Sequence, residues 1–458
     1  MKIKKLVLEN FRRFSRLKID FNPQLTVIVG VNGAGKTSIL DGIAILFGRL
    51  LSHLPNVEGL SISTDDLRMV DTDLLAPRVR CYLQATVDAE HQRLLVPKQA
   101  KHILEWSTSK SRDKSKKTIK DALQSMLEET NVGTKDLINF ADLLIEADNA
   151  GESYLMPVIA YYGTDRATFS TPLRRRNFAT VFARFDSLSG ALNPSANFKR
   201  VFEWMHAKEN EEARERVKRK SFEYQEQELA VVRRAIELFF PRFFKPRTEL
   251  NPLKFVVDAD MGDGLKTYDL NQLSDGYRTT LALVADLACR MAEANPSSSS
   301  SLSDALNSEA IVLIDEIELH LHPGWQQTII PGLRKVFPNT QFIVTTHSPQ
   351  ILTTVPSESI RIVQWGANGV EISVPDFSLG AESQYLLETI LGVSPRPPNE
   401  PISLALERYL TFVNRDQWDC DEALGLRKTL DAWGGGIEPA LINADMDIRV
   451  RAWKRQQT

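Results

Sequence analysis

Near the N-terminus, apolar and polar positions alternate, which predicts short strands over residues 5–11 and 16–21. A continuous apolar run, Leu25–Val29, follows and is typical of a strand that is buried on both faces. The run ends in a glycine-rich loop, and from Ser38 onward the spacing of apolar residues predicts a helix. Strand, loop and helix in this order are the unit from which α/β folds with a parallel sheet are built.

The second half of the chain returns to this alternation of strand and helix. Apolar runs at 310–314 and 341–346 flank a helical pattern at 325–337, which predicts two further strands of a parallel sheet. Residues 155–162 form another apolar run and predict a buried strand. In residues 79–87, apolar and mostly polar positions alternate with a period of two. This pattern predicts a strand with one solvent-exposed face in an antiparallel side sheet.

Two charged segments interrupt this pattern. Residues 197–239 combine helical spacing with many charges, so we expect one or two exposed helices, which serve either as a lid or as a docking surface for a nuclease or DNA. Residues 107–120 are polar, and the part from 110 to 120 is rich in lysine and arginine. We interpret this stretch as a solvated loop, with contact to a nucleic-acid backbone as the alternative.

These patterns predict an α/β fold with a mixed, mainly parallel sheet, an antiparallel side sheet and an inserted helical subdomain. A proline-rich stretch at 394–401 sets off the C-terminal end. We divide the chain into an N-terminal lobe (1–95), a variable insertion (96–154), a core strand and loop (155–196), a helical insertion (197–250), a C-terminal lobe (251–393) and a C-terminal tail (394–458).

Composition narrows the class of protein. Of the 458 residues, 43% are hydrophobic and 25% are charged, as in soluble globular proteins, and no apolar run approaches the roughly 18 residues of a membrane span. The formal net charge of -3 excludes a polycation, so any nucleic-acid contact requires a local basic patch. The few scattered cysteines predict a cytoplasmic protein without a structural disulfide, and they are Cys81, Cys289 and Cys420.

The strongest chemical signal is the glycine loop after the run at 25–29. Its sequence, GVNGAGKT, fits the pattern G-x-x-x-x-G-K-[ST], in which backbone N–H groups at a helix N-terminus hold phosphate oxygens. Lys36 adds a positive charge to this loop. The hydroxyl of Thr37 is predicted to bind Mg²⁺, and this ion bridges two phosphates of the nucleotide. The residues predicted to bind ATP are Gly30, Val31, Asn32, Gly33, Ala34, Gly35, Lys36, Thr37 and Ser38.

Polar side chains follow the two later strands. Because ligands bind at the carboxyl ends of parallel strands, we predict Asp315 as the second Mg²⁺ ligand and Glu316 as the general base that activates the attacking water. His347 ends the next strand and is predicted to contact the γ-phosphate, with a structural turn as the alternative. We interpret His320 and His322 as part of an interface loop, because a zinc site would need further ligands.

Residues 273–278 read LSDGYR, and a serine ahead of a helical pattern is what an ordinary N-cap looks like. The order of motifs supports a second interpretation. Phosphate loop, LSDGYR, LIDE and TTH follow one another as in the ABC-type ATPases, which this chain resembles. In that family the signature covers ATP held by a second subunit. The resemblance therefore implies an ABC-type head that forms a head-to-tail homodimer, with Ser274 and Gly276 acting on the ATP of the other copy.

Within this superfamily the chain is similar to the RecF, SMC and OLD branch. The similarity lies in LENFRRF at the start, the long insertion before the signature, and DEIELHLHP. It implies that Arg12 or Phe14 approaches the nucleotide. The stretch YYGTDR stands where transporter ATPases carry a glutamine loop, so the role of Asp165 and Arg166 stays open.

More narrowly, IAYYGTDR, LNQLSDGYR, QFIVTTHSPQIL and the tail EPALINADMDIRVRAW resemble the PtuA-like ATPases of Septu antiphage defence. The resemblance implies an ATPase that gates a separate HNH nuclease and has a possible DNA or retron RNA–DNA partner. A DNA-clamping repair or chromosome-maintenance ATPase is the alternative. A self-contained OLD-type nuclease would need an acidic metal site after a C-terminal strand. DCDE at 419–422 and ADMD at 444–447 follow no apolar strand, so we interpret them as solvated carboxylates.

Overall fold

The computed structural model divides the chain into two compact units, Met1–Leu386 and Leu387–Thr458, which we describe separately. Within the part of the chain that the structure describes, no helix combines the length and the apolar character needed to cross a membrane. The described residues are 1–72, 74–87, 103–112, 133–152, 154–167, 182–194, 198–250, 253–260, 262, 264–296, 303–367 and 369–457.

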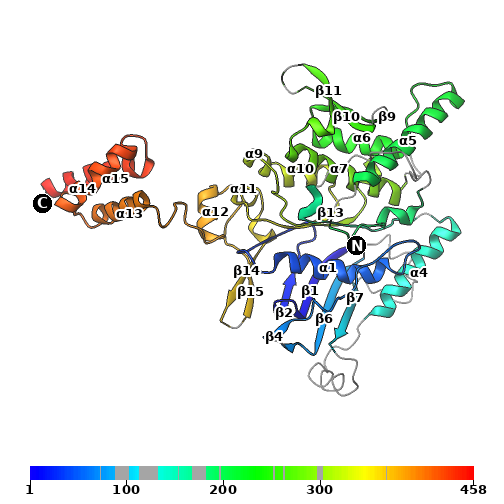
Figure 1. The fold of residues 1–458 in the computed structure, drawn as a ribbon, viewed down its shortest axis with the longest axis horizontal. Coiled ribbons are helices and arrows are strands. Elements are labelled where there is room, and N and C mark those ends of the chain that lie inside the picture. The colour runs from blue at the N-terminus through cyan, green and yellow to red at the C-terminus, as the bar shows by residue number, and fades with distance from the viewer. Residues whose placement is uncertain are drawn as a thin grey trace. The chain divides into compact units, whose positions relative to one another are not determined.

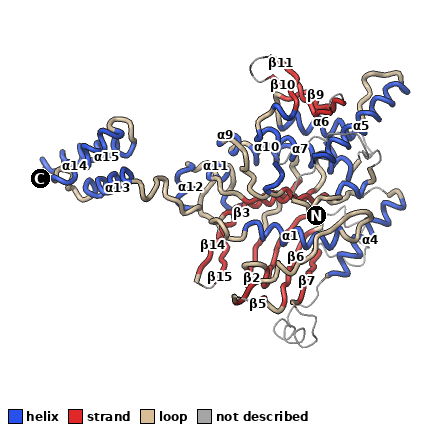
Figure 2. Tube along the Cα trace, viewed as in Figure 1, coloured by secondary structure: helices blue, strands red, loops and turns tan. Residues whose placement is uncertain are grey.

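A six-stranded sheet forms the centre of the first unit (Figure 1, Figure 2). Its order is β15-β14-β3-β13-β12-β8, and all neighbours are parallel except the hairpin of β14 and β15. The strands β3, β13, β12 and β8 are buried along their whole length, as expected where both faces of a sheet are covered. The strands are β3 Leu25–Val29, β8 Val158–Tyr162, β12 Ala310–Ile314, β13 Thr340–Thr345, β14 Ile360–Gly366 and β15 Gly369–Ser373.

Different layers cover the two faces of this sheet. The helix α1 (Lys36–Leu51) and a four-stranded antiparallel sheet lie on one side (Figure 1). The helices α6 (Gln227–Phe239), α7 (Asp275–Ala294) and α10 (Ile329–Val336) lie on the other. The α/β fold with a mainly parallel sheet and an antiparallel side sheet is thereby confirmed. The side sheet has the order β2-β1-β6-β7, with strands β1 Lys2–Phe11, β2 Phe14–Asp20, β6 Arg78–Thr86 and β7 Ile103–Ser111.

The polar stretch that we expected to be a loop from residue 107 onward begins instead as part of β7. This strand pairs with β6 over its whole length, from Ile103 opposite Thr86 to Ser111 opposite Arg78. Trp106 anchors it, because the ring is fully buried and its Nε1 donates to Leu46 O at 2.9 Å. The loop prediction is wrong for 107–111 because strand pairing overrides local polar composition. Residues 113–120 lie outside the described residues.

The charged segment folds into two helices, α5 (Phe198–Arg219) and α6 (Gln227–Phe239). The prediction of helices is confirmed, but the expectation that they are exposed is wrong for one face of each. Trp204 and Val232 are fully buried, and both helices pack against α7 (Asp275–Ala294). The many charges outnumber the apolar residues, yet a few apolar positions at helical spacing are enough to bury a face.

The helical pattern at 325–337 is divided between two helices, α9 (Pro323–Gln326) and α10 (Ile329–Val336). Pro331 falls in the first turn of α10, where its missing N–H removes no helix hydrogen bond. The other described elements of this unit are β4 Met69–Asp71, β5 Leu74–Leu75, α4 Thr134–Ala150, η1 Thr164–Ala167, η2 Arg184–Leu188, β9 Phe243–Leu250, β10 Leu253–Asp260, β11 Leu265–Asp269, η3 Leu270–Gln272, α8 Ser303–Leu306, α11 Pro349–Leu352 and η4 Ser357–Ser359. The helix α12 (Ser383–Thr389) begins in this unit and ends in the second.

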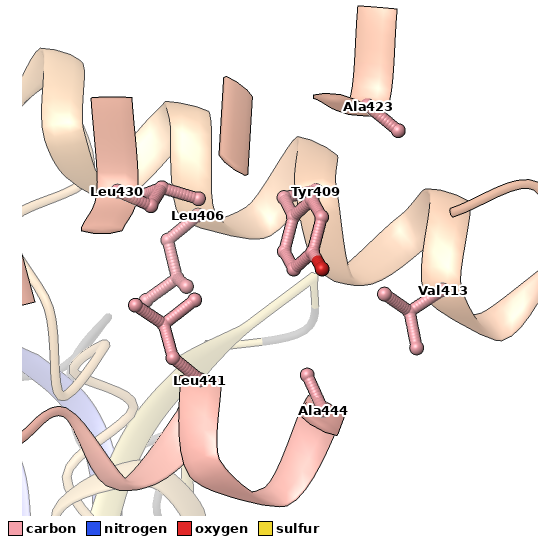
Figure 3. Close-up of a cluster of buried hydrophobic side chains, with 7 residues drawn as sticks. All are labelled: Leu406, Tyr409, Val413, Ala423, Leu430, Leu441 and Ala444. Carbon is pink, nitrogen blue, oxygen red and sulfur yellow. The ribbon is translucent and has the colours of Figure 1, made fainter. Parts of the chain in front are cut away.

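The second unit contains three helices, α13 (Pro401–Asn414), α14 (Asp421–Gly434) and α15 (Pro439–Gln457). Their inward faces meet in a small apolar cluster, which Figure 3 shows between the helices. The segment from 394 that we named a tail therefore contains a folded helical unit with a core of its own. That core consists of Leu406, Tyr409, Val413, Ala423, Leu430, Leu441 and Ala444.

Two leucines on α14 provide a test of this core. Leu430 is fully buried in the cluster, whereas Leu424 is 54% exposed. We expect Leu430→Ala to lower the unfolding free energy of the second unit by about 2–5 kcal/mol, because it leaves a cavity, and Leu424→Ala to change it by less than about 0.5 kcal/mol. Hydrogen exchange of residues 401–457 measures both. Equal protection in the two variants would show that the cluster does not hold the helices.

Candidate nucleotide site

The phosphate loop, residues 30–37, connects the end of β3 to α1. Two of its glycines leave no room for a side chain, since a Cβ on Gly30 would lie 2.6 Å from Val363 O and one on Gly35 would lie 2.4 Å from Phe14 Cζ. Gly35 is also the N-cap of α1, with φ of 102° and no side-chain cap. The first N–H groups of α1 therefore face the loop without a side-chain acceptor, as a phosphate site requires.

Lys36 lies inside this loop, where its Nζ donates to Gly30 O at 3.0 Å. Burial lowers the pKa of Lys36, and three carboxylates near β12 act in the opposite direction and raise it. These are Asp315, Glu316 and Glu318. The ammonium group is thus held mainly by neutral carbonyl oxygens, and phosphate oxygens arriving in the loop would add the anionic contacts that it lacks.

The structure brings Thr37 and Asp315 together although 278 residues separate them. Thr37 Oγ1 donates to Asp315 Oδ2 at 2.8 Å, and Asp315 is 4% exposed. Thr345 at the end of β13 holds the other oxygen, because its Oγ1 donates to Asp315 Oδ1 at 2.5 Å. The same Oγ1 accepts the N–H of Glu316 at 2.7 Å. One hydroxyl on the neighbouring strand therefore orients both carboxylate residues.

The donor set at this point fits Mg²⁺ bound together with a nucleotide. Mg²⁺ usually keeps several waters and takes one or two protein oxygens plus phosphate oxygens, and the side chains of Thr37 and Asp315 offer such oxygens. No group of three or more His, Cys, Asp or Glu that could hold a metal occurs among the described residues. A metal cage made of protein ligands alone is therefore not present in that part of the chain.

Glu316 and His347 lie beside this pair. Glu316 has φ of 47°, a left-handed conformation that costs free energy in a residue other than glycine and that is typical of functional sites. Burial, followed by the charge of Lys36, lowers the pKa of His347 below its usual value, so its imidazole is neutral at pH 7. The N–H of His347 donates to a carboxylate oxygen of Glu318.

The signature, residues 273–278, begins α7. Ser274 occupies the N-cap, but its side chain makes no capping hydrogen bond and is exposed. Gly276 packs under the loop after β12, where a Cβ would lie 2.8 Å from His320 O. Among the described residues, no hydrogen bond joins Ser274 or Gly276 to the phosphate loop of the same chain. The ordinary capping bond of a serine is therefore not formed, and the hydroxyl faces solvent.

The N-terminal segment contacts the phosphate loop through a residue that the sequence did not single out. Arg12 pairs with Asp41 of α1 and with Asp66, the latter at 2.9 Å from its Nε. Arg13 instead donates to the carbonyl of Gly33 within the loop. A nucleotide contact by Arg12 therefore stays a prediction. Phe14 is fully buried under the loop, where it supports Gly35.

A family model described as an AAA domain matches residues 5–237, about half of the chain. The chain belongs to this AAA domain family. It is 27% identical to "Retron Ec83 probable ATPase" of Escherichia coli over 99% of this chain and 88% of that protein. It is 26% identical to "Septu protein PtuA" of Bacillus mycoides (strain KBAB4) over 76% of this chain and 38% of that protein. The resemblance to ABC-type ATPases with retron and Septu relatives is thereby confirmed.

Among solved structures, the SMC head domain from Thermotoga maritima aligns with this AAA domain protein with a TM-score of 0.40 and 17% identity. The alignment covers 82% of this chain and 100% of that one.

Other candidate residues lie in ordinary structural surroundings. His322 caps α9, since its Nδ1 accepts the N–H of Gly324 at 3.3 Å. Asp165 lies in η1 directly after β8, and its role stays open. In the second unit, Asp445 pairs with Arg427, and that pairing lowers the pKa of Asp445. The acidic groups at 419–422 and 444–447 belong to a helical unit, and their interpretation as solvated carboxylates stays a prediction.

Sequence reasoning did not identify Thr345, Glu318 and Arg13 as parts of the site. A threonine at the end of an apolar strand is common, so nothing in the sequence marks Thr345 as a partner of Asp315. Glu318 falls in the turn after β12, where an acidic residue is normally solvated. Only the pairing of β12 with β13 brings these side chains to one edge of the sheet.

Two threonines on β13 provide a test of how Asp315 is oriented. Thr345 bonds to Asp315 and Glu316, whereas the hydroxyl of Thr340 at the other end of the strand is buried and has no partner among the described residues. We expect Thr345→Val to cost about 1–3 kcal/mol of stability and to weaken Mg²⁺-dependent nucleotide binding, because two polar groups lose their partner. Thr340→Val serves as the control.

Thr340→Val removes only an unpaired hydroxyl, so its effect on stability should be neutral or favourable. Thermal unfolding and titration with a fluorescent nucleotide measure both variants. Equal behaviour of the two valines would contradict the orienting role of Thr345.

Proposed function

We propose that this chain binds Mg-ATP and hydrolyses it to ADP and phosphate. The contact between Thr37 and Asp315 beside the buried Lys36 supports this most directly, because it combines a phosphate loop with a magnesium ligand pair. The name "probable ATPase" of a relative that aligns over nearly the whole chain points to the same activity.

In this mechanism each residue has a distinct task. The N–H groups of the phosphate loop and the ammonium of Lys36 bind phosphate oxygens. Thr37 and Asp315 would hold Mg²⁺, which when bound neutralises charge on the phosphates. Glu316 takes the proton from the attacking water, and the neutral imidazole of His347 hydrogen-bonds at the γ-phosphate position.

A homodimer completes the site in this proposal. Ser274 stands at the exposed start of a 20-residue helix with a hydroxyl that caps nothing, so it is free to donate to a phosphate presented by a second copy. Gly276 is required within its own chain as well, because His320 O leaves no room for a Cβ. Head-to-tail pairing would place the signature of each copy over the phosphate loop of the other.

We further propose a cytoplasmic role in antiphage defence, in which ATP binding and hydrolysis gate a separate nuclease of the HNH type, with DNA or a retron RNA–DNA as a further partner. The retron and Septu names of the two relatives support this setting. Copurification of the chain with the product of its adjacent reading frame tests it. A DNA-clamping repair ATPase would instead show DNA-stimulated hydrolysis without a nuclease partner.

Substitution of the proposed base separates binding from turnover. We expect Glu316→Gln to bind Mg-ATP normally, to lose about 10²–10⁴-fold in kcat, and to accumulate as a dimer in saturating Mg-ATP. Single-turnover hydrolysis and light scattering measure these effects. The exposed Glu358 supplies the control, because Glu358→Gln should match the wild type in both assays. A wild-type hydrolysis rate in Glu316→Gln would show that Glu316 is not the general base.

Mixing two inactive variants tests whether the site is shared between copies. Ser274→Arg should keep nucleotide binding but block turnover, and Lys36→Ala should lose binding, because each variant damages a different half of the site. A mixture rebuilds one composite site per heterodimer, so we expect partial activity, at most about half of the wild-type rate per dimer. ATP turnover by Ser274→Arg alone, or no recovery of activity in the mixture, would argue that the two copies do not share a site.

A further inference from the structure

Glu318 is a carboxylate near the phosphate loop that the proposed reaction does not use. It lies three residues after Asp315, in the turn that follows β12. One of its oxygens, Oε1, accepts the N–H of His347 in the loop that follows β13. Its negative charge also raises the pKa of Lys36 and that of His347, so the carboxylate lies near both of these groups.

The second oxygen of Glu318 has no hydrogen-bond partner. Oε2 is enclosed by the protein, and it is one of the buried side-chain atoms among the described residues that lack a partner. A buried carboxylate oxygen without a donor is costly, so such an atom in a native structure points to a strained position, a catalytic role, or a water or ion bound there.

A purely structural role for Glu318 accounts for only one of its two carboxylate oxygens. Holding the His347 turn needs a single acceptor, which Oε1 provides. A short polar side chain is the usual acceptor for a nearby backbone N–H, and it would leave no second oxygen buried. The unpaired Oε2 therefore needs a hydrogen-bond donor, and a water molecule is a donor of suitable size.

We infer that Glu318 is a positioning residue of the nucleotide site, holding the His347 turn through Oε1 and binding through Oε2 a water that becomes ordered when nucleotide is present. This inference rests on the proposed ATPase activity. Glu318 does not take the proton in this scheme. It sets where His347 and the ordered water stand relative to the γ-phosphate position.

Two substitutions separate the two oxygens. Glu318→Gln keeps an acceptor for the His347 N–H but replaces the other oxygen by an NH₂ donor, whereas Glu318→Ala removes both acceptors. We expect Glu318→Gln to lower kcat about 10- to 100-fold, with the nucleotide Kd and the unfolding temperature of the nucleotide-free protein unchanged. Glu318→Ala should lower kcat at least as much, and Glu358→Gln should leave it unchanged.

A double-mutant cycle with His347→Ala adds a readout that a structural defect would not give. If Glu318 acts through the His347 turn, the combined variant loses less activity than the product of the two single losses. Losses that multiply, or wild-type kcat in Glu318→Gln, would overturn the inference. Absence of hydrolysis in the wild-type protein would instead overturn the proposed function, so the two failures are distinguishable.

Discussion

The contact between Thr37 and Asp315 is the constraint on which the rest of the site depends. It joins the first turn of α1 to the end of β12, two places 278 residues apart, across the intervening strand β13. Thr345 on that strand bonds to Asp315 and accepts from Glu316. Parallel strands bring their carboxyl ends to one edge, and a phosphate loop at that edge gains its acidic partners by sheet order alone.

Close packing around the loop leaves no room for a side chain at Gly30 or Gly35. Phe14 supports Gly35 from the N-terminal sheet, and Val363 O approaches Gly30 from β14. The left-handed backbone of Glu316 is held by the hydrogen bond to Thr345 on the neighbouring strand. The side sheet, through Phe14, and the hairpin of β14 and β15, through Val363, thus shape the phosphate loop.

Much of the fold was predictable because apolar runs and glycine loops are local signals. The buried strands at 25–29 and 310–314, the loop at 30–37 and the helix after the signature all lie where the sequence places them. The predictions that were wrong concern segments whose structure depends on distant partners. β7 is polar yet pairs with β6, and the charged helix α5 buries Trp204 against the rest of the unit.

The sequence by itself determined which residues could bind phosphate and magnesium, since that chemistry depends on residue type and short spacing. Tertiary structure alone decided which of them meet. It paired Thr345 with Asp315 and placed Arg13 rather than Arg12 on the phosphate loop. Within the described part of the chain, it also left Ser274 without a capping hydrogen bond and one oxygen of Glu318 without a donor. Contacts of this kind arise from strand order and packing between segments hundreds of residues apart, which no local pattern encodes.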